Sequence, residues 1–193
     1  MDASSITQYI TTTFADIHPV AAWGETSFFY NPGRKLPRGI YFATLKDKDG
    51  KNDRASNLQR PSVFRLNIGI SKPTYRTLFG TQPSRPAAGG IIDTGHDFTA
   101  LDQLLPHPVY GWMSWVCVLN PSRATFETVK PLLAEAYTLA NGKFAKRVVG
   151  VVIGLYLYRL IRYYMLLYLY ETKPICRKDW CHLQDRLPYV QAG

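Results

Sequence analysis

The segment from Pro61 to Ile70 constrains the fold more than any other part of this chain, because its side chains alternate strictly in character. Apolar residues at every second position alternate with a mixed set: Phe64, Leu66, Ile68 and Ile70 with Val63, Arg65, Asn67 and Gly69. A period of two is that of a β-strand, in which successive side chains point to opposite faces. We predict a strand with one buried face and one face that is solvated or functional.

A second strand is predicted between Trp112 and Leu119, where every residue is apolar or small. The run is short, is bounded by proline and contains aromatic and β-branched residues, which favours a buried strand over a helix. Downstream, apolar residues recur at helical spacing from Phe126 to Ala140, and basic residues at 143–147 would suit the end of a helix. We expect this strand to be central in a sheet and the helix to pack against it.

Shorter patterns predict the other elements. Helical spacing of apolar residues predicts a helix over 5–17, and Ser71 followed by Pro73 predicts the start of another. Short strands are predicted at 26–30 and 39–45, a mobile loop at 81–95 and a short helix after Thr99. The order favours an α+β domain over residues 1–147: a small antiparallel sheet with the N-terminal and C-terminal helices packed on one side.

The composition bears on compartment and partners. The formal net charge of +9 favours a polyanion or an anionic membrane surface as partner, although bases and acids alternate as on an ordinary solvated surface. An odd number of cysteines without a signal peptide favours a reducing, cytoplasmic location. Neither His96-Asp97 nor the group Cys176, Cys181 and His182 has the spacing of a standard zinc site, so we expect no metal and no cofactor.

Residues 148–193 form a hydrophobic, tyrosine-rich extension that leaves three alternatives open. The run 148–170 is long enough to span a bilayer once, which would anchor the protein in a membrane, but Arg159 and Arg162 lie inside it and about offset its apolar residues. The second alternative is an amphipathic or partner-bound helix. The third, which we slightly favour, is translated noncoding sequence that would be poorly packed against the domain.

Four polar residues are the candidate ligand-binding residues: Arg60, Arg65, Asn67 and His107. Arg65 and Asn67 share the polar face of one strand, and Arg60 enters the same strand. A guanidinium beside a carboxamide can bind a carboxylate or a phosphate. The alternative is a solvated face on which these side chains form ion pairs, for example with Asp47 or Asp49.

His107 stands between two prolines, in a rigid segment that leads into the strand predicted at 112–119. It would serve as an acid–base group or an anion contact, or it would simply bind loop backbone. Seven aromatic residues would line a pocket between the polar face of the sheet and the loop at 81–95, or would form core: Trp23, Phe28, Phe29, Tyr30, Tyr41, Trp112 and Trp115.

Four ordered stretches resemble a known family: Phe42–Leu45, Arg60–Gly69, Leu105–Gly111 and Trp115–Pro121. Over about residues 6–147 the chain resembles an uncharacterised bacterial and fungal family, the domain of unknown function 6194 family, and this resemblance implies no established activity, substrate or cofactor. More weakly, the order of elements resembles the MmcQ/YjbR-like fold, which is frataxin-like in shape and has been suggested to bind DNA. That resemblance implies an architecture only, because a fold does not fix a function.

Together these observations favour a binding module for an anionic ligand or a protein partner, with the four candidate residues as its contacts. One alternative is a small enzyme in which His107 is the acid–base group and Arg65 holds an anionic substrate. Another is weak, nonspecific and salt-sensitive binding of nucleic acid. Replacing His107 with alanine would separate the first two, since an enzyme would lose turnover while it still binds.

Overall fold

The structure is a computed structural model that describes residues 1–172. The chain groups into two compact units, Met1–Val148 and Val149–Gly193. The first unit contains the six-stranded sheet and the helices that cover it, whereas the second continues as helix to Thr172.

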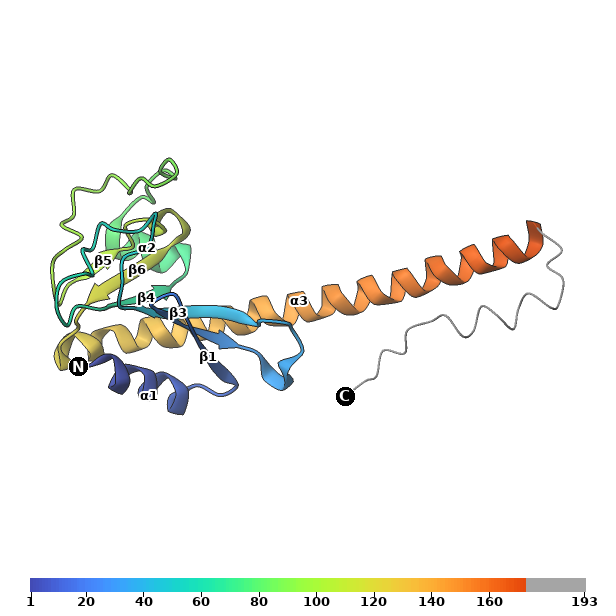
Figure 1. Cartoon of the computed structure of the whole chain (residues 1–193), viewed down its shortest axis with the longest axis horizontal. Coiled ribbons are helices and arrows are strands. Elements are labelled where there is room, and N and C mark those ends of the chain that lie inside the picture. The colour runs from blue at the N-terminus through green and yellow to red at the C-terminus, as the bar shows by residue number, and fades with distance from the viewer. Residues whose placement is uncertain (173–193) are drawn as a thin grey trace. The chain divides into compact units, whose positions relative to one another are not determined.

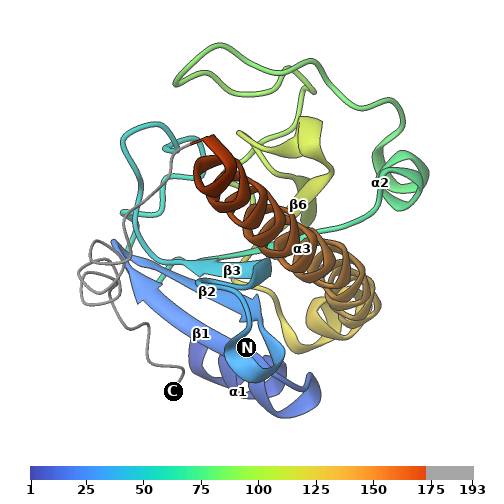
Figure 2. The ribbon, with the colours of Figure 1, turned by 90° about the vertical axis from the view of Figure 1, so that its right-hand side faces the viewer.

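Six antiparallel strands form the sheet, in the spatial order β1-β2-β3-β4-β6-β5 (Figure 1). Their bounds are β1 Ile17–Ala22, β2 Glu25–Tyr30, β3 Ile40–Lys46, β4 Arg65–Gly69, β5 Leu104–Pro106 and β6 Trp115–Leu119. Figure 2 shows β1, β2 and β3 side by side across one half of the sheet. The first four strands are therefore neighbours both in sequence and in space, and the pair β5–β6 joins them through β4.

Side-chain caps set where the three α-helices begin. The helices are α1 Ala3–Thr13, α2 Lys72–Phe79 and α3 Arg123–Thr172, and two short 3-10 turns are η1 Pro32–Arg34 and η2 Gly111–Met113. The side chains of Asp2, Ser71 and Ser122 each accept the backbone N–H three residues further on, which satisfies a donor that a helix start leaves free. At the other end of α2, Gly80 adopts a positive φ of 77° that a glycine reaches without strain.

One face of the sheet is covered by α1 and by the part of α3 that precedes residue 149. Ile6 of α1, Phe28 of β2, and Phe126 and Leu133 of α3 are at most 1% exposed and belong to one apolar cluster. The rings of Tyr9 and Phe126 meet edge to face at 5.2 Å, so α1 runs beside the first turns of α3 (Figure 1). The predicted α+β fold, with both terminal helices on one side of an antiparallel sheet, is confirmed.

A β-bulge in β3 decides which side chains reach the opposite face. Strict alternation from Thr44 would place Phe42 on the face of Thr44. The pairing with β2 passes over Phe42, which packs in the core with 2% of its surface exposed. Tyr41, paired with Phe29, therefore shares the face of Thr44 and is 51% exposed. A bulge of this kind re-aims a side chain without ending the strand.

The strand predicted at 112–119 exists but is shorter and lies off centre. It begins at Trp115, because Gly111–Met113 form a 3-10 turn that Ser114 ends with a left-handed backbone, φ 64°. β6 lies next to the short edge strand β5, and the middle of the sheet is occupied by β3 and β4. The apolar character of this run correctly predicted that it is buried, but it did not predict the position of the strand in the sheet.

The N-terminal helix is also shorter than predicted. It ends at Thr13, and Ile17, His18 and Pro19 belong to β1. Proline lacks a backbone donor and is tolerated in a strand at the edge of a sheet, which is where β1 lies. The helical spacing of apolar residues extended to Ile17 by chance, since Ile17 belongs to this edge strand.

The helix predicted after Thr99 does not form. The carboxylate of Asp97 accepts both the backbone N–H and the hydroxyl of Thr99, which closes a local turn. The carboxylate of Asp102 accepts the backbone N–H of Ser122, so this segment ties down the start of α3. Residues 81–100, which include the predicted mobile loop, contain neither helix nor strand.

The last helix does not end at 143–147 as predicted but runs on to Thr172. Within residues 1–172, no helix combines the length and apolar character needed to cross a bilayer, so the first of the three alternatives for the extension, a membrane-spanning segment at 148–170, is not supported.

Candidate functional site

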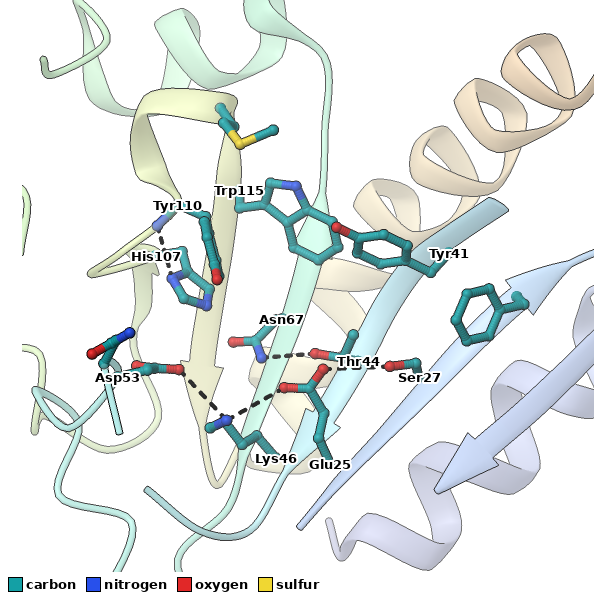
Figure 3. A pocket seen from close by; sticks show the side chains of 13 residues that line it. Glu25, Ser27, Tyr41, Thr44, Lys46, Asp53, Asn67, His107, Tyr110 and Trp115 are labelled. Atoms are coloured by element: carbon teal, nitrogen blue, oxygen red, sulfur yellow. Dashed lines mark hydrogen bonds and ion pairs between the residues drawn. The ribbon is translucent and has the colours of Figure 1, made fainter. Parts of the chain in front are cut away.

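A cavity of about 400 Å³ opens on the face of the sheet that α1 and α3 leave uncovered (Figure 3). Alternation along the strands separates the two faces: Phe28 and Ile68 point into the core, whereas Phe29 and Asn67 point to the cavity. The lining residues are Glu25, Ser27, Phe29, Tyr41, Thr44, Lys46, Asn52, Asp53, Asn67, His107, Tyr110, Met113 and Trp115. Its size lies within the range of small-molecule sites in proteins.

Aromatic rings form one wall of the cavity. Tyr41 lies between Phe29 and Trp115, with ring centroids 5.9 and 5.4 Å away. Trp115 can lie over β4 because Gly69, its partner in the strand pairing, has no side chain: a Cβ at this position would stand 2.9 Å from the indole. The bulge in β3 and this glycine therefore place two rings side by side, as Figure 3 shows.

A buried polar network lies beneath the rest of the cavity, centred on Arg65. Its guanidinium donates from Nη1 to Asp53 at 3.0 Å and to the Ser56 hydroxyl at 2.7 Å, and from Nε to the Asn67 carbonyl oxygen at 2.8 Å. Nη2 donates to the second carboxylate oxygen of Asp53. Asn67 in turn donates to the Thr44 hydroxyl at 2.9 Å. Although Arg65 is fully buried, oxygen atoms of Asp53, Ser56 and Asn67 therefore accept hydrogen bonds from its guanidinium.

His107 closes the network from the β5–β6 side. Its Nδ1 lies 3.1 Å from the backbone nitrogens of Val109 and Tyr110, which point their N–H groups at it, and its Nε2 lies 3.2 Å from Nη2 of Arg65. Both ring nitrogens thus face N–H donors. Burial lowers the pKa of His107 well below its usual 6.5, and the charge of Arg65 lowers it further. The ring is therefore neutral at physiological pH.

Two carboxylates and one ammonium stand at the polar end of the cavity. Lys46 lies 3.5 Å from Glu25 and 3.8 Å from Asp53 (Figure 3). Burial by itself would raise the pKa of Asp53, but the hydrogen bonds and charge of Arg65 lower it below its usual 3.8. Asp53 is therefore ionised, and the four charged groups of this region, including the buried Arg65, sum to zero.

Cys117 lies below this region on β6, where it is buried and its thiol is protonated. It is 1% exposed, and burial raises the pKa of its thiol to about 12, so the thiolate is not populated near neutral pH. Among the described residues, no three His, Cys, Asp or Glu side chains gather as a metal site would require. His96 instead packs against Phe79 and Phe98. Cys176, Cys181 and His182 lie outside the described residues.

Three of the four candidate residues come together, and one does not. Asn67 and His107 line the cavity, and Arg65 lies directly beneath it. Arg60 points elsewhere: its guanidinium donates to the carbonyl oxygens of Ser56, Asn57 and Thr99 and so fastens two loops together. The ion pair expected at Asp47 or Asp49 forms with Asp53, and β4 presents a buried polar face rather than a solvated one.

The predicted aromatic residues divide in the same way. Phe29, Tyr41 and Trp115 line the cavity, whereas Phe28 and Tyr30 are core. Trp23 is 98% exposed at the turn between β1 and β2, and Trp112 lies under the guanidinium of Arg85. The loop at 81–95 contributes no residue to this cavity, whose far wall comes from residues 52–53 and 107–113.

Sequence reasoning missed the charged end of the cavity. Glu25, Ser27 and Phe29 occupy alternate positions of β2, as Thr44 and Lys46 do in β3, and this period-two pattern carried the signal. Asp53 has no such signal, since it lies in a polar loop among several acids and only the folded chain brings it to Arg65.

Comparisons with known proteins supply a family and no activity. Residues 1–149 match a family of unknown function, DUF6194, and they include every residue of the cavity. No curated protein and no solved structure matches the chain, so the weaker resemblance to the MmcQ/YjbR-like fold stays a prediction. The match covers most of the chain and agrees with the family resemblance of its sequence motifs, and the chain therefore belongs to the DUF6194 family.

Proposed function

We propose that this domain binds a small molecule in the cavity on the open face of its sheet. The ligand would have a flat, unsaturated ring that stacks on Tyr41 and Trp115. It would also have a polar head with both donors and acceptors that reaches Asn67, Lys46 and Glu25. Apolar walls with a few convergent polar groups are the usual composition of a small-molecule site.

The observation that carries this proposal is the buried network of Arg65, Asp53, Asn67 and His107 under an open cavity. Removing charged groups from water is costly, and replacing a buried ion pair with apolar side chains is often neutral or stabilising. Stability alone therefore gives little reason for such a network. Its effect on the cavity is to hold Asn67 in one orientation and to keep His107 neutral, which is the preorganisation that a binding site requires.

The charges at the cavity favour a polar head that is neutral overall. Glu25 and Asp53 balance Lys46 and Arg65, and Lys46 already lies near both carboxylates. An anionic head in this end of the cavity would have to displace a carboxylate from Lys46. An amide, a urea or a similar group would instead accept from Lys46 and Asn67 while it donates to Glu25.

The same geometry favours binding over acid–base catalysis at His107. A neutral imidazole has one lone pair, and in either tautomer that lone pair already faces donors: the two backbone N–H groups at Nδ1 or Arg65 at Nε2. His107 would have to give up a partner before it could accept a proton from a substrate.

The test uses the full chain and a panel of neutral flat compounds with amide heads: benzamide, nicotinamide and indole-3-acetamide. We expect members of the panel to raise the melting temperature, because a ligand of the folded state stabilises it by mass action. Tyr41→Ala should weaken their binding about 10-fold or more, the order of one lost stacking contact.

The matched control is Tyr156→Ala, which removes a tyrosine that is 64% exposed and lies outside the first unit. It should leave the affinities unchanged. The proposal would be wrong if no panel member bound, or if Tyr41→Ala bound the panel as well as the natural chain does.

A further inference from the structure

A second, shallower cavity of about 490 Å³ adjoins the first and shares three of its residues, Tyr41, Met113 and Trp115. Beyond these it is lined by Ile40 and by three residues of α3: Lys143, Lys146 and Arg147. All seven residues belong to the first unit. The pair of aromatic rings therefore stands between a polar cavity on one side and a basic surface on the other.

The three basic residues form a coherent cationic patch. Their spacing of three and four places them on one face of α3. All three are exposed, and the second cavity contains no acidic residue. Within residues 1–172, the ion pairs involve Lys46, Arg65 and Lys130 and none of these three. Among the described residues, no acidic group therefore compensates the positive charge here, in contrast to the balanced charges around Lys46.

We infer that Lys143, Lys146 and Arg147 form a subsite for the phosphate of a small phosphorylated ligand, whose flat ring stacks on Tyr41 and Trp115. This inference rests on the proposed ring site and assigns the ligand a class: a heterocycle with one or more phosphates, as in a mononucleotide. Three uncompensated cations suit the two negative charges of a phosphate monoester, and arginine can bind it in bidentate fashion.

The shape of the first cavity favours a small molecule over a nucleic-acid strand. A single strand is usually bound along an open groove in which successive bases stack on successive aromatic residues. Here the rings border a cavity whose other end is occupied by the network of Lys46, Glu25 and Asp53. One ring fits against that wall, and a continuing chain would have to leave over the basic patch alone.

The experiment compares nucleosides with their 5′-monophosphates, using adenosine, guanosine, cytidine and uridine on the full chain by calorimetry. At least one monophosphate should bind about 10-fold or more tightly than its nucleoside, and this gain should fall as salt rises from about 50 to about 200 mM. The triple variant Lys143→Gln, Lys146→Gln and Arg147→Gln should lose the gain while it keeps the nucleoside affinity. Tyr41→Ala should weaken both members of the pair.

A matched control removes the same charge elsewhere, through Lys72→Gln, Arg76→Gln and Arg123→Gln, three exposed residues of α2 and α3 outside both cavities. This variant should retain the gain, which separates a local subsite from net charge.

Equal affinity of nucleoside and nucleotide, or an undiminished gain in the Lys143, Lys146 and Arg147 variant, would overturn the subsite and leave ring binding standing. Binding of oligothymidylate but of no mononucleotide would also overturn it, in favour of a nucleic-acid surface. If no pair binds, the phosphorylated class is wrong, and the neutral panel decides ring binding separately.

Discussion

The two faces of the sheet bury side chains of opposite character. Under α1 and α3, Phe28, Leu66 and Ile68 are buried among apolar side chains, where removal from water is itself favourable. On the other face of the same strands, Arg65 and Asn67 are buried equally well, at 0% and 2% exposure, but here the buried side chains are polar and form hydrogen bonds with one another and with their neighbours. The first face accounts for the stability of the fold, whereas the second gains little stability and holds polar groups in fixed positions beside a cavity.

The largest effect on stability should come from removing one partner of the buried ion pair between Arg65 and Asp53. Arg65→Met removes the guanidinium and leaves Asp53, Ser56 and Asn67 without their donor. We expect a loss of about 3–5 kcal/mol in the free energy of unfolding, measured by urea denaturation. The double variant Arg65→Met, Asp53→Leu should recover much of this loss. Similar stability of the single and double variants would mean that the ion pair does not organise this face.

Truncating a side chain on the apolar face should lower the free energy of unfolding by nearly as much. It should leave the ligand cavity on the opposite face of the sheet unchanged. Leu133→Ala in α3 removes a side chain with 0% exposure and leaves a cavity in the core, and we expect a loss of about 2–5 kcal/mol. Ligand affinity, measured well below the lowered melting temperature, should stay unchanged. A loss of affinity that accompanies the loss of stability would show that the two faces are coupled, and their roles in stability and in binding could then not be separated.

Lowering the pH should destabilise the fold through the titratable groups of the polar face, since the buried apolar cluster on the other face has no histidine or carboxylate among its residues. The folded-state pKa of His107 lies below its unfolded value of 6.5, so the unfolded chain binds more protons as pH falls below 6.5. The free energy of unfolding should therefore decrease by up to about 1.4 kcal/mol per pH unit in that window. Asp53, whose folded pKa is lowered below 3.8, adds a further decrease only at lower pH.

The variant that tests this assignment is His107→Asn, because asparagine can still accept backbone N–H groups but does not titrate. It should abolish the slope between pH 6.5 and about 4.5, above the window of the carboxylates. His96→Gln, a substitution of an exposed histidine outside the network, is the control and should retain the slope. A slope that survives in His107→Asn would assign it to another group.

The smallest effect on stability should come from the aromatic wall. Gly69→Ala places a methyl group 2.9 Å from the Trp115 indole and should push the ring toward the cavity at a cost of about 1 kcal/mol. Binding of the neutral ring panel should fall by a larger factor than stability, since the stacking surface is displaced. Gly142→Ala, where a methyl group meets no atom within 4 Å, is the control.

The sequence by itself determined the elements whose signal is local. Alternation from Phe64 to Ile70 predicted β4 and placed Arg65 and Asn67 on one face, and Ser71, Pro73 and Gly80 marked the ends of α2. These patterns are readable because period, caps and turn residues act over a few positions, where side-chain chemistry and backbone geometry are directly linked.

Only the tertiary structure decided which distant groups meet. Asp53 reaches Arg65 because the loop after β3 folds back over the sheet, and one unpaired residue at Phe42 turns Tyr41 toward Trp115. Neither event has a local signature, since a loop carboxylate looks alike with or without a partner and a bulge is defined by the neighbouring strand. The order β4-β6-β5 was hidden for the same reason: pairing between strands far apart in the chain is selected by the packing of the whole sheet.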